Sequence, residues 1–310
     1  MLEKPAPRRG QEIVEAVRGL HDEIRAAADE IEKLGRLTDG VVSALRDAGV
    51  FGMALPEAMG GPEADPMTQL EVAETLSIAD GSVGWVVTIG SDTGYYAAHL
   101  PEATAAEMFA DPQTITASVL VPKGKARRVD GGYRATGHWA FGSGGLHAEW
   151  FGGSCLVEDD DAKPGAPPNI RTLFFPASEV RVHDNWQTTG LAGSGSNDWS
   201  VDDVFVPEAR AISIFEPARI DTPLYAYPWL LIANAPGVSL GLARAGIDEL
   251  VGLAREKRTL AGSKLEDDLV VQMRVGRAEA DLAAARAYIY QATERLWATL
   301  CDGRTPTLEE

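Results

Sequence analysis

Apolar residues recur at steps of three and four in the first part of the chain, which is the spacing of one buried helix face. The clearest run spans residues 13–34, with Gly35 as its stop, and comprises Ile13, Val17, Leu20, Ile24, Ala27, Ile31 and Leu34. A second helix is predicted over 38–48, with Thr38 or Asp39 as its N-cap. Further helices are expected over about 67–78, 82–99 and 101–109, so residues 1–112 are predicted to form an N-terminal helical domain.

From Thr114 onward the apolar pattern changes to the alternation that is typical of strands. Six short runs are rich in β-branched and aromatic residues: ITASVLV, GYRATGHWAF, WFGGSCLV, IRTLFFP, VRVHDN and WSVDDVFVP. The DGG at 130–132 is a hairpin turn signal, and the acidic, proline-containing stretch at 158–168 is expected to be an exposed loop. We therefore expect residues 113–215 to form a compact antiparallel β sandwich or barrel.

Helical spacing returns after Pro207, with helices predicted over 227–257 and 267–300. The second of these carries one apolar stripe: Leu282, Ala285, Ile289, Ala292, Leu296 and Leu300. Two such helices make a poor core and four make a bundle, so 216–310 is expected to be part of a C-terminal helical bundle and to favour a homo-oligomer. Residues 305–310 carry an N-cap, a proline and a capping-box Glu, which indicates either a helix about to start or a polar tail.

Composition narrows the class of protein. Lys and Arg number 28 against 46 Asp and Glu, and this net charge of −18 argues against nucleic acid or an anionic membrane surface as a partner. No apolar signal segment stands at the N-terminus, and the most apolar stretch is interrupted by Asn234, Pro236 and Arg244, so we expect a cytoplasmic protein without a membrane span. Cys155 and Cys301 make no disulfide framework, and the five histidines have no metal-ligand spacing, so no metal is expected.

Two segments could carry chemistry, although P-loop and Rossmann motifs are absent from the sequence. In GHWAFGSGGLHAEW (137–150), Trp139, Phe141 and Ser143 alternate, which predicts that they share one strand face. Two aromatic rings and a hydroxyl suit a flat conjugated ring, whereas the alternative is a strand that packs its aromatics into a β core. GLAGSGSND (190–198) could bring backbone amides to phosphate or ring oxygens, or be an ordinary surface loop.

The order of helical domain, β domain and helical bundle resembles the acyl-CoA dehydrogenase superfamily over about residues 11–310. LPEAMGG (55–61) resembles its P-E-x-x-G-G loop, TGLAGSGSNDWSVDDVFVPEAR (189–210) resembles its G-x-x-x-[ST]…V-x-V-P strand pair, and LAREKRTLAG (253–262) resembles its A-x-x-R-x-x-x-G turn. The resemblance implies an α+β multidomain fold whose C-terminal bundle is cut short, because family members continue for further helices. It also implies a homo-oligomer, either a tetramer or a dimer.

Within the superfamily, W-A-F-G-S-G (139–144) resembles the W-x-F-x-S-G of the flavin-dependent monooxygenases, and ASVLVPKGKARRVDGG (117–132) stands where dehydrogenases carry T-E-P-x-x-G-S-D. That branch implies FAD or FMN as the cofactor, reduced by a separate flavin reductase, and oxygen transfer through a C4a-hydroperoxide to a small aromatic or similar substrate. An acyl-CoA dehydrogenase with FAD is the alternative within the superfamily. A flavin-free binding or scaffolding protein of the same fold is the alternative from another class.

The resemblance also implies site residues. Trp139, Phe141 and Ser143 match the strand beside the flavin, with Ser143 near the ring nitrogen N5. Catalytic roles are implied for Ser143, for Ser118 as a second hydroxyl, and for Asp92 as the base, or Thr93 if the match shifts by one position.

Two further positions are implied outside that strand. Trp85 matches the helix over the substrate pocket, and Arg258 matches an arginine that reaches flavin phosphates across a dimer interface.

Overall fold

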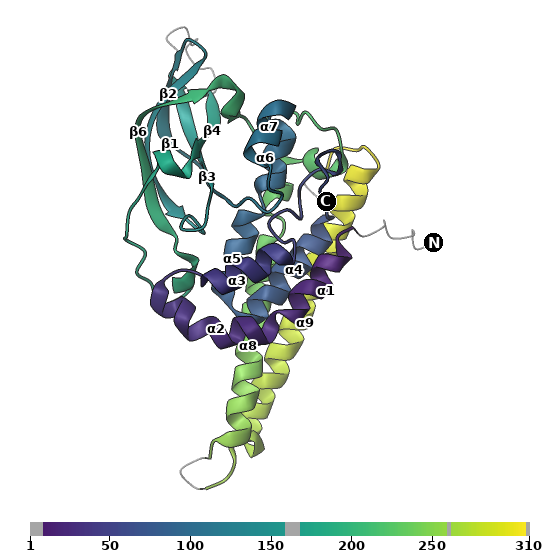
Figure 1. Cartoon of the computed structure of the whole chain (residues 1–310). Coiled ribbons are helices and arrows are strands. Elements are labelled where there is room, and N and C mark those ends of the chain that lie inside the picture. The colour runs from purple at the N-terminus through teal and green to yellow at the C-terminus, as the bar shows by residue number, and fades with distance from the viewer. Residues whose placement is uncertain (1–8, 159–167, 259–261, 308–310) are drawn as a thin grey trace.

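Helices, then strands, then helices follow one another along the chain (Figure 1). The computed structural model describes residues 9–158, 168–258 and 262–307. The first helices are α1 (Gln11–Gly19), α2 (His21–Leu34), α3 (Asp39–Asp47), α4 (Pro66–Ala79), α5 (Gly81–Gly90), α6 (Thr93–His99) and α7 (Glu102–Met108). The strands are β1 (Thr116–Val129), β2 (Gly132–Gly142), β3 (Trp150–Glu158), β4 (Ile170–Pro176), β5 (Arg181–Val182), β6 (Asn197–Pro207) and β7 (Ala211–Ile212). Two long helices follow, α8 (Ala235–Glu256) and α9 (Leu269–Cys301).

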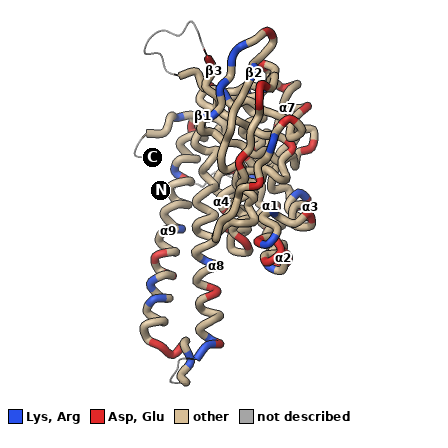
Figure 2. Tube along the Cα trace, turned by 90° about the vertical axis from the view of Figure 1, so that its left-hand side faces the viewer, with Lys and Arg blue, Asp and Glu red and all other residues tan. Residues whose placement is uncertain are grey.

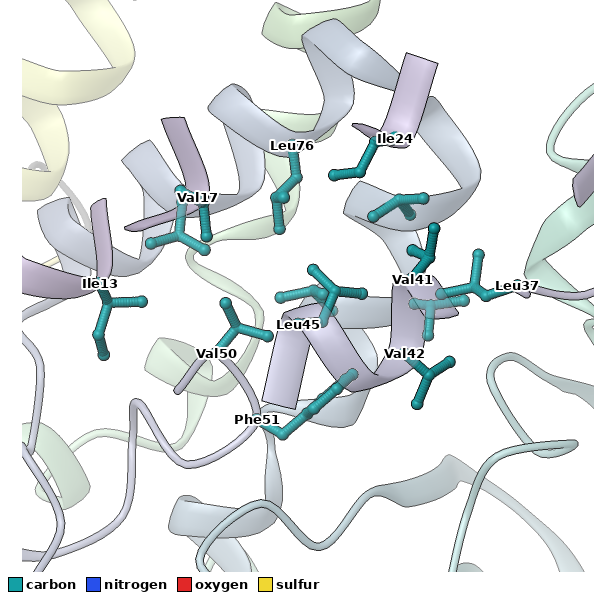
Figure 3. Close-up of a cluster of buried hydrophobic side chains, with 14 of the residues drawn as sticks. Ile13, Val17, Ile24, Leu37, Val41, Val42, Leu45, Val50, Phe51 and Leu76 are labelled. Carbon is teal, nitrogen blue, oxygen red and sulfur yellow. The ribbon is translucent and has the colours of Figure 1, made fainter. Parts of the chain in front are cut away.

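The N-terminal helices begin and end largely where their capping residues stand. Gly35 ends α2 in the left-handed conformation (φ 64°), and the Thr38 side chain accepts a hydrogen bond from Val41 N at the start of α3. The single helix predicted over 13–34 is wrong, because the chain breaks at Leu20 between α1 and α2. The break lets both halves direct their apolar faces to one core, in which Ile13 and Ile24 are buried near Leu45 of α3 (Figure 3).

The strands form one seven-stranded sheet with the order β5-β6-β2-β1-β3-β4-β7. The expectation of a purely antiparallel sandwich or barrel is wrong in one respect, because β1 and β3 pair in parallel while the other neighbours are antiparallel. Strand β2 forms a hairpin with β1 and occupies one edge of it. Strand β3 pairs with the opposite edge of β1, so the chain crosses over β1 between β2 and β3. The expected exposed loop at 158–168 lies almost wholly outside the described residues, as do residues 259–261 of the resembling turn and 308–310 of the chain's end.

Helices α4 and α8 cross in close contact, which joins the two helical regions into one layer. A Cβ at Gly237 would lie 2.5 Å from the Leu70 carbonyl oxygen, and a Cβ at Gly241 would lie 2.4 Å from that of Glu74. The stretch Pro228–Glu256 is long and apolar enough to cross a membrane by length and composition. The first half of α8 packs in the core, because Gly237 and Gly241 bring its backbone against α4.

The ends of α8 and α9 that are joined by residues 257–268 project beyond the rest of the molecule as a hairpin, as both Figure 1 and Figure 2 show. The predicted stripe on α9 is buried in this chain only toward its end, at Leu300, whereas Ala285 is exposed. Leu269 and Met273 at the projecting end are 78% and 68% exposed. The hairpin therefore presents apolar surface that no described residue covers.

Candidate active site

A cluster of hydroxyl groups lies where the end of β2 meets α5 and the loop before β6. The Trp85 indole Nε1 donates to Ser143 Oγ at 2.9 Å, and Ser143 Oγ lies 2.7 Å from Ser196 Oγ. Ser196 Oγ in turn lies 2.7 Å from Ser194 Oγ, and Gly144 N donates to the Ser194 carbonyl oxygen at 2.9 Å. The two segments that the sequence singled out, 137–150 and 190–198, thus meet at one place.

The end of β2 is irregular, and this irregularity sets the directions of its side chains. The register with β6 shifts between Trp139 and Gly142, and Phe141 has a positive φ of 65°. A non-glycine residue rarely adopts this conformation, which here breaks the strand's alternation. Phe141 is consequently 67% exposed and meets the Trp186 ring edge-on at 6.1 Å, while Ser143 is buried against Trp85.

The expectation that Trp139 shares a face with Phe141 and Ser143 is wrong. Trp139 is fully buried in the core of the sheet, where its ring stacks on Trp199 at 4.2 Å and its N–H donates to the Ser154 carbonyl oxygen at 3.0 Å. A side chain enclosed in this way cannot touch a cofactor. For Trp139 the alternative reading holds, in which the strand packs its aromatic residue into the β core.

The glycines of this region make room for that indole. A Cβ at three of them would lie 2.3–2.7 Å from the Trp139 ring, namely at Gly124, Gly137 and Gly153. Contacts this close are excluded for real Cβ atoms, so these positions require glycine. At these three positions the glycines of the strands serve packing.

A second polar cluster surrounds the turn between α5 and α6. The predicted helix over 82–99 breaks there, so that Asp92 precedes the first turn of α6. The Tyr96 hydroxyl donates to Asp92 Oδ2 at 3.3 Å and forms a short hydrogen bond with Ser118 Oγ on β1. Tyr96 was missed in the sequence, although its i, i+4 spacing from Asp92 on a predicted helix is the signal that could have found it.

Burial dominates the electrostatics of this cluster. Asp92 is 4% exposed, and burial raises the pKa of its carboxyl well above the ordinary value, against the opposing hydrogen bond from Tyr96. Burial, followed by the nearby Asp92, also raises the pKa of the Tyr96 hydroxyl. Ser118 is half-buried, so it is the member of this cluster that is open to a ligand.

Asp92 and Thr93, the two positions considered for the base, differ in their contacts. Thr93 Oγ1 bonds to the carbonyl oxygens of Gly90 and Thr114 and to Thr116 Oγ1, all of them buried. These contacts tie α6 to β1 and satisfy the Thr93 hydroxyl within the buried interior. Asp92 is therefore the candidate base.

Arg258 follows the end of α8 by two residues, and that end of α8 lies in the projecting hairpin, away from the sheet (Figure 1). Its guanidinium Nη1 donates to the Gly262 carbonyl oxygen at 2.9 Å. Within one chain it does not join the site, so the role that the resemblance implies for it needs a second copy and stays a prediction.

The residues around Ser143 fit a flat ring system with polar edges. Phe141 offers an exposed aromatic face beside the buried Ser143 hydroxyl, and Val121, 57% exposed, lies on the neighbouring strand β1. Exposed apolar side chains beside buried, hydrogen-bonded hydroxyls are the surface that the isoalloxazine ring of a flavin would cover. A cavity of about 730 Å³ elsewhere, lined by residues such as His99, Arg171 and Glu208, touches neither polar cluster.

Comparison with known proteins gives consistent similarities. Residues 9–104 match the acyl-CoA dehydrogenase N-terminal domain and 233–309 match the C-terminal domain of the same family. The chain is 35% identical to indole-3-acetate monooxygenase of Pseudomonas putida over 283 residues, which are 90% of this chain and 72% of that protein. It is 32% identical to the flavin-dependent monooxygenase oxygenase subunit HsaA of Mycobacterium tuberculosis (strain CDC 1551 / Oshkosh), over 96% of this chain and 78% of that protein.

Solved structures of similar proteins superpose closely on this chain. The crystal structure of 3-HSA hydroxylase from Rhodococcus sp. RHA1 superposes with a TM-score of 0.88 at 29% identity, covering 96% of this chain and 79% of that one. XiaF from Streptomyces sp., solved with FADH2 and glycerol, superposes with a TM-score of 0.86 at 28% identity, covering 96% of this chain and 78% of that one.

Proposed function

Because the chain belongs to the acyl-CoA dehydrogenase family and is a flavin-dependent monooxygenase by its relatives, we propose that it hydroxylates a small aromatic substrate with reduced flavin that a separate reductase supplies. The observation that carries the proposal is the buried carboxyl of Asp92, connected to the half-exposed hydroxyl of Ser118 on the strand next to that of Phe141 and Ser143. In this proposal the base and the surface that binds the ring belong to neighbouring elements.

Two residues would hold the flavin. Phe141 would pack on the ring, and Ser143, fixed by the Trp85 indole and by Ser196, would hydrogen-bond its edge. When bound, reduced flavin supplies the oxygen-activating chemistry. Val86 of α5, whose side chain would lie 3.3 Å from a Cβ at Gly144, would help to exclude water from the side of the site that this helix covers.

Ser118 and Asp92 would act on the substrate. A substrate hydroxyl held at Ser118 loses its proton toward the Asp92 carboxylate, and the electron-rich ring that results is more readily attacked at carbon. Burial raises the pKa of the Asp92 carboxyl, which makes its carboxylate a stronger proton acceptor.

Assembly completes the proposal. The uncovered apolar residues of α9, Leu269 and Met273, would be buried in a homo-oligomer, and Arg258 would then approach the flavin of a neighbouring copy. A stable monomer in light scattering would contradict this part.

The test supplies the chain with FMN or FAD reduced by a flavin reductase, oxygen-18 gas and a panel of phenols. We expect one labelled oxygen atom in a hydroxylated product. The proposal fails if no phenol is hydroxylated while an acyl-CoA bleaches bound oxidised flavin, which is the dehydrogenase reaction.

A matched pair of variants tests the flavin site separately. Ser143→Ala removes the hydroxyl beside Phe141 and should weaken flavin binding about three- to tenfold, the factor of one hydrogen bond. Ser200→Ala on β6, whose hydroxyl contacts His183, should leave flavin binding unchanged. Equal losses in both variants, measured by flavin fluorescence quenching, would contradict the placement.

A further inference from the structure

The Asp92 carboxyl, which is 4% exposed, is connected to the half-buried Ser118 through another side chain. Tyr96 is fully buried and its hydroxyl lies between Asp92 Oδ2, at 3.3 Å, and Ser118 Oγ. The Asp92 side chain makes no hydrogen bond to the backbone at the start of α6. The three groups therefore form one row from the interior to the half-exposed Ser118.

The charge of Asp92, the innermost of the three groups, fixes the direction of every hydrogen bond in the row. An ionised carboxylate only accepts, so Tyr96 must donate to Asp92 and Ser118 must donate to Tyr96. Ser118 then presents lone pairs outward and binds a substrate O–H. When the Asp92 carboxyl is protonated, all three bonds can reverse, and Ser118 presents its O–H to a substrate oxygen anion.

We propose that Tyr96 is a proton-relay residue that connects a substrate hydroxyl, bound at Ser118, to Asp92, and that the substrate is an arene with a free hydroxyl. Three protons move by one bond each: from the substrate oxygen to Ser118 Oγ, from Ser118 Oγ to the Tyr96 oxygen, and from Tyr96 to the Asp92 carboxylate. The product is a phenolate that accepts a hydrogen bond from Ser118, and a neutral Asp92. The aromatic nature of the substrate rests on the proposed function, whereas the relay rests on the geometry alone.

The surroundings favour a relay over a static contact. From α6, the groups that face Asp92 are Tyr96 and Tyr95, both hydroxyls, and Asp92 has no ion pair with any described Lys or Arg. A buried carboxylate that has no cationic partner is stabilised when it takes up a proton. Phe174 packs on the Tyr96 ring at 5.1 Å, which holds the hydroxyl in place and would hold a phenylalanine ring equally well.

The variant Tyr96→Phe is therefore the sharpest test, and Tyr95→Phe is its matched control. Tyr95 is the neighbouring residue on α6, equally enclosed, and its hydroxyl donates to the Leu230 carbonyl oxygen at 3.1 Å instead of to Asp92. The probe is para-nitrophenol, which is yellow only as the phenolate, added to the flavin-free chain. Absorbance reports both its affinity and its ionisation.

At about pH 6 we expect the parent chain and Tyr95→Phe to bind the probe as the yellow phenolate. Tyr96→Phe and Asp92→Asn should each bind it colourless and about tenfold more weakly, the factor of a charge-assisted hydrogen bond. The double variant should be no weaker than either single one, because a broken relay cannot be broken twice.

The relay is refuted if Tyr96→Phe binds the yellow form as the parent does, if the losses in the double variant add, or if Tyr95→Phe shows the same loss. It is also refuted if the parent chain binds the probe only in its colourless form or does not bind it. Because the measurement needs no flavin, it fails or succeeds independently of the hydroxylation assay, which tests the proposed function.

Discussion

Replacing Asp92 by asparagine should change how the stability of the chain depends on pH. Asp92 is 4% exposed, and its carboxylate receives one described side-chain hydrogen bond, from Tyr96 at 3.3 Å. Burial raises the pKa of this carboxyl well above its ordinary value. Ionising it in the folded chain therefore costs free energy that the unfolded chain, where the group is in water, does not pay.

The sign follows from proton counting. Between the unfolded pKa of about 3.9 and the raised folded pKa, the folded chain holds one proton more than the unfolded chain. The contribution of Asp92 to stability is thus fully present below about pH 4 and is lost as pH rises through the folded pKa. Across this window, wild type should lose about 1.4 kcal/mol per pH unit relative to Asp92→Asn, which cannot titrate.

Urea unfolding followed by tryptophan fluorescence at a series of pH values measures this difference. Asp47→Asn is the control, because Asp47 is an exposed carboxyl on α3, and its difference from wild type should stay within about 0.5 kcal/mol at every pH. A gap between wild type and Asp92→Asn that is constant, or that moves in favour of wild type as pH rises, would refute the assignment of a buried carboxyl without a cation.

Two packing predictions use the same unfolding assay. Gly241→Ala should lower the free energy of unfolding by about 1–3 kcal/mol, because its Cβ would lie 2.4 Å from the Glu74 carbonyl oxygen. Gly246→Ala on the same helix, with open space around it, should raise that free energy by up to about 1 kcal/mol. Equal effects of the two substitutions would contradict the close crossing of α4 and α8. Trp139→Phe should lower the free energy of unfolding by about 1–3 kcal/mol, because the stack on Trp199 and the N–H donor are lost. The flavin affinity of the folded chain should stay unchanged. A loss of flavin affinity without a loss of stability would show that Trp139 contacts the flavin.

The sequence predicted elements well where a local rule decides them. Thr38 caps α3 through its own side chain, and Gly35 takes the left-handed conformation that ends α2. The break at Leu20 followed no local rule, since apolar spacing continues across it and only the common core of α1, α2 and α3 explains it. The parallel pairing of β1 with β3 is equally non-local.

The site was predicted in part for the same reason. Ser118, Ser143 and Asp92 came from motif resemblance, and the structure places each of them in a polar cluster. What sequence could not supply was the partner of each group, because Tyr96 and Ser196 meet them through tertiary contacts. Alternation failed at Phe141, where a positive φ turns the side chain outward.

Glycine alone does not indicate a ligand site in this chain, and the reason is physical. A glycine can admit a ligand or a neighbouring side chain, and composition cannot tell which of them fills the space. Here Gly137 and Gly153 admit the Trp139 ring, and Gly241 admits the backbone of α4. A buried hydroxyl such as that of Ser143 needs a hydrogen-bond partner and adds little to apolar packing, so it indicates a candidate site better than a glycine does. The search for a ligand in a chain of this kind should therefore begin from its hydroxyls.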